Sequence, residues 1–145
     1  MQKSSAKSAD GADTEAPGRK SEMYPYEENE QIAVFRWAAL EESTYPALRF
    51  LHHIPNGGQR DKATAGRLKA AGVKRGVPDI CLPVPLGGYA GLYIELKAGK
   101  NRPTPEQREW LSALSQFGYF AVVCYGFEEA VATITKYIKQ EAHNG

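Results

Sequence analysis

The residues that decide the fold of this chain read Gly76-Val77-Pro78-Asp79-Ile80-Cys81-Leu82-Pro83-Val84 and, after a short turn, Leu92-Tyr93-Ile94-Glu95-Leu96-Lys97-Ala98. Residues 80–84 and 92–98 are apolar runs of strand length, and the segment between them, Pro85-Leu86-Gly87-Gly88-Tyr89, is typical of a turn. The stretch therefore predicts a β-hairpin. With its turn centred near Gly87, the numbers of paired residues add up to 174, which sets Asp79 opposite Glu95.

Residues 92–97 alternate between apolar and polar side chains. In a strand every second side chain lies on the same face, so the aliphatic residues line one face, and Tyr93, Glu95 and Lys97 line the other. The Cα atoms of Glu95 and Lys97 are then roughly 7 Å apart. Because Asp79 is expected across the hairpin, two carboxylates meet at one strand end, where their oxygens form a site for a divalent ion such as Mg²⁺.

These groups fit the hydrolysis of a phosphodiester bond. Asp79 and Glu95 are expected to hold a metal, which polarises the phosphate and acidifies a bound water. Lys97 is expected to stabilise the extra negative charge of the transition state or to orient the attacking water. The sequence has no nucleophile elbow, Walker loop or dinucleotide-binding glycine motif. A metal-dependent nuclease is therefore the favoured class.

The rest of the chain alternates between predicted helices, at 27–42, 63–71, 104–117 and 127–140, and further predicted strands, at 48–54 and 119–125. This order predicts an α/β protein with a central mixed sheet flanked by helices on both faces. Ile32, Phe35 and Ala39 are expected along one stripe of the first helix, with Val34 and Ala38 nearby. The last strand is expected to be buried on both faces, with Tyr125 and Trp110 in the core.

Several boundaries have chemical signatures. Residues 1–23 show no apolar periodicity and are expected to be a disordered tail before one domain at 24–145. Asp61 is expected to cap the second helix, which Gly72 ends. Thr104 followed by a proline and by Gln107 is a strong helix start, in which Gln107 is a capping-box partner.

The charge of the chain is unevenly distributed. The formal net charge is only +1, but residues 58–102 carry nine basic and three acidic side chains, a local charge of +6. Such a segment is suited to holding phosphates, and Lys69, Lys74 and Arg75 are expected to contact DNA. The alternative is a basic helix face that is merely solvated.

The cysteines and apolar runs indicate the compartment. Cys81 and Cys124 each lie in an apolar run without a CxxC partner, so both are expected to be buried thiols in a reducing, intracellular and cytoplasmic environment. The apolar runs are too short to cross a bilayer, and no secretion signal is indicated.

The motifs Gly76-Val77-Pro78-Asp79 and Ile94-Glu95-Leu96-Lys97 resemble the signature of the PD-(D/E)XK nucleases. The wider pattern is similar to the VRR-NUC branch, particularly its stand-alone phage and prophage members, and the supporting segments are 55–58, 67–76, 104–110 and 118–119. This resemblance implies a restriction-endonuclease-like core and DNA cleavage with Mg²⁺ or Mn²⁺. It also implies a homodimer that acts on branched DNA such as four-way junctions.

The resemblance also implies further site residues. The family supplies an acid from its first helix in a Glu-x-x-x-Gln pattern, which Glu27 and Gln31 match, although Glu28 and Glu30 lie close by. A solvated acidic helix start is the alternative. Gln107 is a secondary active-site candidate, and the backbone carbonyl of Leu96 is expected to join the metal ligands.

Other functions remain open at this point. His52, His53 and Asn56 suggest a His-Asn-His nuclease site, although the second half of that motif is missing. The domain is alternatively a non-catalytic DNA-binding or assembly module, or a monomeric nuclease specific for flaps or nicks. For a homodimer, the candidate surfaces are the tip at 86–89 and the first helix with Trp37, which otherwise pack within the monomer.

Overall fold

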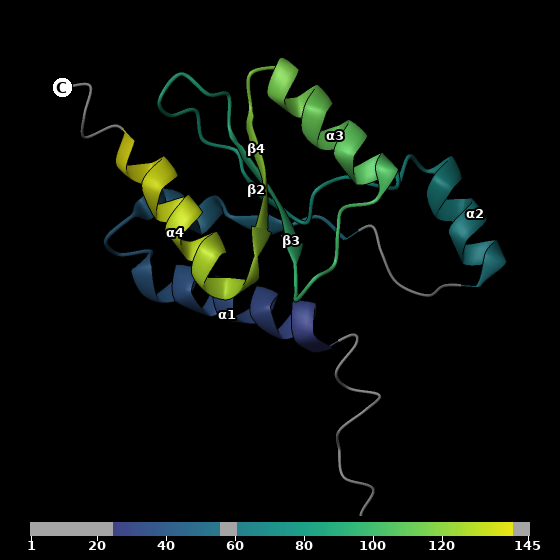
Figure 1. The fold of residues 1–145 in the computed structure, drawn as a ribbon, viewed down its shortest axis with the longest axis horizontal. Helices are drawn as coiled ribbons and strands as arrows, with labels where there is room; N and C mark the ends of the chain where they lie inside the picture. The colour runs from purple at the N-terminus through teal and green to yellow at the C-terminus, as the bar shows by residue number, and fades with distance from the viewer. Residues whose placement is uncertain (1–24, 56–60, 141–145) are drawn as a thin grey trace, which may run out of the picture.

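The computed structural model describes residues 25–55 and 61–140, so the tail expected at 1–23 lies outside the described residues. These residues form one mixed sheet whose strands lie in the order β1-β2-β3-β4 (Figure 1). The strands are β1 (His52–His53), β2 (Ile80–Leu82), β3 (Leu92–Lys97) and β4 (Phe120–Tyr125). β2 is antiparallel to both β1 and β3, and β4 is parallel to β3. The predicted α/β class with a mixed sheet is therefore confirmed.

Helices cover both faces of this sheet. They are α1 (Pro25–Glu41), the 3₁₀ helix η1 (Pro46–Phe50), α2 (Lys62–Ala70), α3 (Pro105–Gln116) and α4 (Gly126–Lys139). α1 and α4 pack against each other and against β3, whereas α3 contacts β4 from the opposite side (Figure 1). None of the helices in the described residues is long and apolar enough to span a membrane.

The hairpin has the register that the sequence predicts. Ile80 is the partner of Ile94, and all three residue pairs of β2 and β3 have numbers that add up to 174. Leu86 and Tyr89 close the tip with two main-chain hydrogen bonds, and both glycines between them adopt positive φ, of 59° and 85°. A two-residue turn with positive φ at both positions matches the right-handed twist of the strands. Its closing pair, Leu86 and Tyr89, adds up to 175, so the turn is offset by one residue from the register of the strand pairs.

The core lies between the apolar face of the hairpin and the two helices α1 and α4. It includes Leu82, Leu92, Ile94, Leu96, Ala130 and Ile134. In α1 the buried residues are Val34 and Ala38, which lie beside the predicted stripe, whereas Ile32 is 42% exposed and Ala39 is exposed. Several stripes of this helix are apolar, so its contacts with α4 and β3 select which of them is buried.

The strand predicted at 48–54 is mostly wrong. Residues Pro46–Phe50 form η1, and only His52–His53 pair with β2. Leu48 and Leu51 are both buried, at 3% and 7% exposure. A spacing of three places both side chains on one face of a 3₁₀ turn, and Pro46 supplies a preset φ at its start.

The last strand is less buried than expected. β4 is at the edge of the sheet, and among its residues only Cys124 is fully buried. Tyr125, predicted in the core, is 41% exposed, and Trp110 is only half-buried. The prediction for the cysteines is confirmed, since Cys81 and Cys124 are free and buried.

The apolar side chains that were candidates for a dimer surface contact the core of the chain itself. Leu86 is buried at 8% exposure, and Tyr89 makes an edge-to-face contact with Phe120 at a centroid distance of 5.2 Å. Trp37 packs against the same core. Leu86 is thus covered within the chain, whereas Tyr89 and Trp37 are half-buried.

Candidate active site

Asp79 completes the hydrogen bonding at the end of the hairpin. Leu96 lies two residues beyond Ile94, so its main-chain groups point to the same edge of β3, toward β2. β2 begins only at Ile80, however, so the strand supplies no main-chain acceptor opposite Leu96. The Oδ2 atom of Asp79 accepts the Leu96 N–H at 2.8 Å and so replaces the missing main-chain acceptor.

The main chain of Asp79 is held from the other side by the edge strand. Its carbonyl accepts hydrogen bonds from the Ile54 N–H at 2.8 Å and from His53 Nδ1 at 2.7 Å. Because a carbonyl oxygen only accepts, Nδ1 of His53 must carry the proton. Asp79 is thus fixed through its side chain by β3 and through its carbonyl by the segment around β1.

Glu95 and Lys97 are buried on the polar face of β3. Glu95 is 1% exposed and Lys97 is 8% exposed. The Lys97 Nζ atom lies 3.3 Å from Glu95 Oε1, whereas Glu95 Oε2 has no hydrogen-bond partner among the described residues. A buried carboxylate oxygen without a partner is costly, so this site favours a bound cation or a proton.

Burial raises the pKa of both carboxyl groups, and Asp79 raises that of Glu95 further. Burial, and then the negative charge of Asp79, raise the pKa of Glu95 to about 8. Burial also raises the pKa of Asp79, an effect that the hydrogen bond from Leu96 opposes. Lys97 lowers the pKa of both groups but supplies only one positive charge for two carboxylates.

The donor set fits a hard divalent cation. Residues 25–55 and 61–140 contain no cluster of three or more His, Cys, Asp or Glu side chains that could hold a metal ion. Mg²⁺ typically takes only one or two carboxylates and completes its shell with water and substrate oxygens. Asp79 and Glu95, with the unpartnered Oε2, match that requirement.

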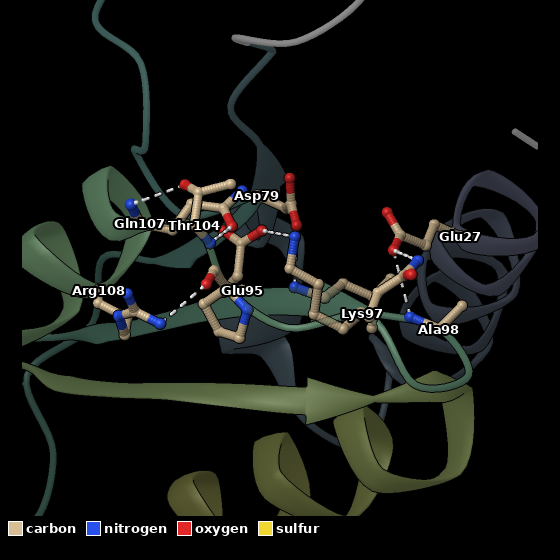
Figure 2. Close-up of polar contacts among 11 residues, drawn as sticks. Glu27, Asp79, Glu95, Lys97, Ala98, Thr104, Gln107 and Arg108 are labelled. Carbon is tan, nitrogen blue, oxygen red and sulfur yellow. Dashed lines mark hydrogen bonds and ion pairs between the residues drawn. The ribbon is translucent and has the colours of Figure 1, made fainter.

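Glu27 lies at the end of β3, beside Lys97. Its Oε1 atom accepts hydrogen bonds from the Ala98 N–H at 3.3 Å and from Asn101 Nδ2 at 3.2 Å. Figure 2 shows Asp79, Glu95 and Lys97 between Glu27 on one side and the start of α3 on the other. These two bonds join the first turn of α1 to the chain that follows β3.

The neighbouring acids of α1 are placed differently. Glu30 accepts a hydrogen bond from the Phe127 N–H at the start of α4, where it satisfies a free helix donor. Glu28 is exposed. Of the three acids in this turn, only Glu27 has a hydrogen bond to the chain next to Lys97.

Gln107 forms the capping box of α3. Its side-chain oxygen accepts the Thr104 N–H at 2.8 Å, and its own N–H donates to the Thr104 hydroxyl at 3.2 Å. The side chain therefore lies at the margin of the site with its oxygen already used in the cap (Figure 2).

The other candidates lie outside the carboxylate cluster. Lys69, in the last turn of α2, and the following Lys74 and Arg75 are exposed. His52 Nδ1 contacts the Phe50 carbonyl at 3.0 Å, and Asn56 lies outside the described residues. The contact between His53 and Asp79 was not predicted, because it joins residues 26 positions apart through a main-chain atom.

Comparisons with known proteins agree with this arrangement. The family model for the VRR-NUC domain matches residues 25–128, which include Glu27, Asp79, Glu95 and Lys97. The chain belongs to the VRR-NUC family. A solved structure described as a VRR_NUC domain protein is 33% identical, with a TM-score of 0.68, and the match covers 79% of this chain and 89% of that chain. No curated protein matches the chain.

The VRR-NUC family belongs to the PD-(D/E)XK nuclease superfamily, so the resemblance inferred from the sequence is confirmed. Its members are generally nucleases, which makes DNA the expected partner of this chain. The mixed sheet and its flanking helices are the restriction-endonuclease-like fold of that superfamily.

Proposed function

We propose that this chain is a metal-dependent DNA endonuclease whose active site is centred on Asp79, Glu95 and Lys97. The observation that carries the proposal is the buried carboxylate pair, in which Glu95 Oε2 has no partner within residues 25–55 and 61–140 and Lys97 Nζ lies 3.3 Å from Oε1. Charged groups on a solvated surface would not be buried in this way. A buried one costs folding free energy, which a function that binds a cation and a phosphate explains.

Asp79, Glu95 and the Leu96 carbonyl would hold the metal, Mg²⁺ or Mn²⁺. The N–H of Leu96 points to Asp79, and in an extended strand the carbonyl of the same residue points to the same edge, which supports its role as a third ligand. A metal bound there supplies charge that polarises the phosphate and lowers the pKa of water.

Lys97 would act on the reacting phosphate itself. Its burial keeps the ammonium close to Glu95 and largely out of bulk water, where a positive charge interacts more strongly with a developing negative charge. Glu27 would position the end of β3 through its bond to Ala98, next to the catalytic lysine. Gln107 would contribute from the start of α3, through the amide nitrogen that the capping box leaves over.

The substrate would be branched DNA, such as a four-way junction, and the working unit a homodimer. The carboxylate cluster gives one site per chain, whereas resolving a junction requires two cuts. A two-fold symmetric dimer supplies two equivalent sites. The alternatives are a monomeric nuclease acting at flaps or nicks, and a binding module without catalysis.

One cleavage panel tests these proposals. Labelled four-way junction, flap, nicked duplex and intact duplex are incubated with Mg²⁺, Mn²⁺ or EDTA, in parallel with the Glu95→Gln variant. We expect cleavage of junction DNA that needs metal and is absent in the variant. Cleavage of flaps alone by a protein that light scattering finds monomeric would favour the single-cut alternative. Tight binding without cleavage of any substrate would favour the binding module.

A further inference from the structure

Helix α2 has an unusual position in the molecule. It has nine residues and none of them is buried. It projects from the body beyond the start of α3 (Figure 1). Helices shorter than about 12–15 residues are marginal in water unless tertiary packing supports them, so the folded body does little to stabilise α2.

The contacts that do hold α2 are local. The Asp61 carboxylate caps its start by accepting the Thr64 N–H at 2.7 Å and the Thr64 hydroxyl at 3.0 Å. Gly66, in the middle of the helix, lowers helix stability because glycine loses more backbone freedom than alanine on folding. A Cβ atom at Gly66 would meet nothing within 4 Å, so no packing contact requires a glycine there.

The chain that follows this helix passes close to α3. Gly76 has a φ of 92°, and a Cβ there would lie 2.7 Å from the main-chain carbon and oxygen of Glu106, in the first turn of α3. Asp79 follows three residues later. A partner bound along α2 is therefore held close to the carboxylate cluster.

The charge of this arm, defined here as residues 61–78, selects the partner. It contains five basic side chains, all exposed, which are Lys62, Arg67, Lys69, Lys74 and Arg75. Its one acid, Asp61, is engaged in the helix cap. Five positive charges and one negative charge give a net charge of +4, which complements the phosphates of a nucleic acid.

We propose that the arm is a DNA-docking element whose helix α2 is only partly formed in the free protein and becomes fully formed on DNA. The choice of DNA as the partner rests on the proposed function, whereas the coupling between helix formation and DNA binding goes beyond it. If only a fraction of free molecules holds the helix, the apparent Kd equals the intrinsic Kd divided by that fraction. Substitutions that change helix stability without changing charge therefore change DNA affinity in the same direction.

A glycine–alanine series tests this coupling. Gly66→Ala should tighten binding to a labelled DNA junction by up to about fivefold, or about 1 kcal/mol, and Ala65→Gly should weaken it. The double variant moves the glycine by one position and should return to wild-type affinity. Binding is measured by fluorescence anisotropy in the Glu95→Gln background, which separates it from cleavage. Ala132→Gly, at an exposed position of α4, is the matched control and should leave DNA affinity unchanged.

Hydrogen exchange supplies a second readout. Amides of α2 should exchange quickly in the free protein and become protected on DNA, more so in Gly66→Ala. DNA binding that is equal in all three variants would overturn the coupling but leave the nuclease proposal intact. Variants that change self-association rather than DNA affinity would assign the arm to a second copy of the chain and overturn the proposal as well. Failure of the wild type to bind any DNA would instead refute the proposed function, and the DNA-docking role with it.

Discussion

Replacing Glu95 by glutamine should stabilise the metal-free protein while it abolishes cleavage. The wild-type site holds two carboxylates and one ammonium, and the pKa of Glu95 is about 8 rather than its ordinary 4.5. Glutamine has nearly the same shape and no charge. In the variant one carboxylate, Asp79, and one ammonium, Lys97, remain, so the buried site has no excess charge.

The magnitude and its pH dependence follow from that pKa. A tenfold change in proton affinity corresponds to about 1.4 kcal/mol, so the cost of ionising buried Glu95 reaches roughly 5 kcal/mol as an upper limit above pH 8. The lost contact between Lys97 and Glu95 offsets part of the gain. We expect a net stabilisation of about 1–3 kcal/mol at pH 8, or roughly 4 °C in Tm per kcal/mol.

The sign is fixed by linkage. The folded-state pKa is raised, so the unfolded state releases the Glu95 proton at lower pH than the folded state does. The stability that the protonated group contributes is present below pH 4.5 and is lost as the pH rises to about 8. The glutamine variant does not lose this stability, so the difference in Tm between variant and wild type should grow as the pH rises from 4.5 to about 8.

Thermal unfolding followed by circular dichroism in EDTA, at several values between pH 5 and pH 9, measures this difference. Glu109→Gln, an exposed glutamate of α3, is the matched control and should show no such trend. Addition of Mg²⁺ should stabilise the wild type and leave Glu95→Gln nearly unchanged, because a ligand stabilises only the form that binds it. A variant less stable than the wild type at every pH, or a difference independent of pH, would refute the account of a strained carboxylate pair.

Three further predictions concern neighbouring residues. Lys97→Ala should abolish cleavage but leave Mn²⁺ affinity, measured by calorimetry, within severalfold of wild type. Asp79→Ala should lose Mn²⁺ binding, because a carboxylate is a metal ligand and an ammonium is not. Equal losses of Mn²⁺ affinity in both variants would contradict these roles. His53→Ala should lower kcat several-fold, and His53→Asn, whose amide nitrogen can replace Nδ1 as donor to the Asp79 carbonyl, should recover most of it; equal activity in the two variants would remove the positioning role. Gly76→Ala should cost about 2 kcal/mol or more in the free energy of unfolding, because its Cβ would lie 2.7 Å from main-chain atoms, while the control Gly72→Ala, with a φ of 102° and open space, should cost only about 1 kcal/mol.

The sequence by itself determined the features that depend on neighbours along the chain. Period-two alternation put Glu95 and Lys97 on one face of β3, and the pairing of the two apolar runs in a hairpin brought Asp79 to the same end. The caps at Asp61 and Thr104 were readable because their partners lie three residues away. In each case one local interaction decides the geometry, so no knowledge of distant segments is needed.

Only the tertiary structure decided which of several equivalent local choices is used. The start of α1 contains several acids. Because α1 packs on α4 and β3, Glu30 accepts a hydrogen bond at the start of α4, and Glu27 accepts one from the chain beside Lys97. The same packing selects the buried stripe of α1. The link from His53 to Asp79 joins side chain to main chain across 26 residues and has no periodicity in sequence. The burial of Glu95, which raises its pKa, likewise follows from how helices cover the sheet, because burial is a property of the assembled layers rather than of any one strand.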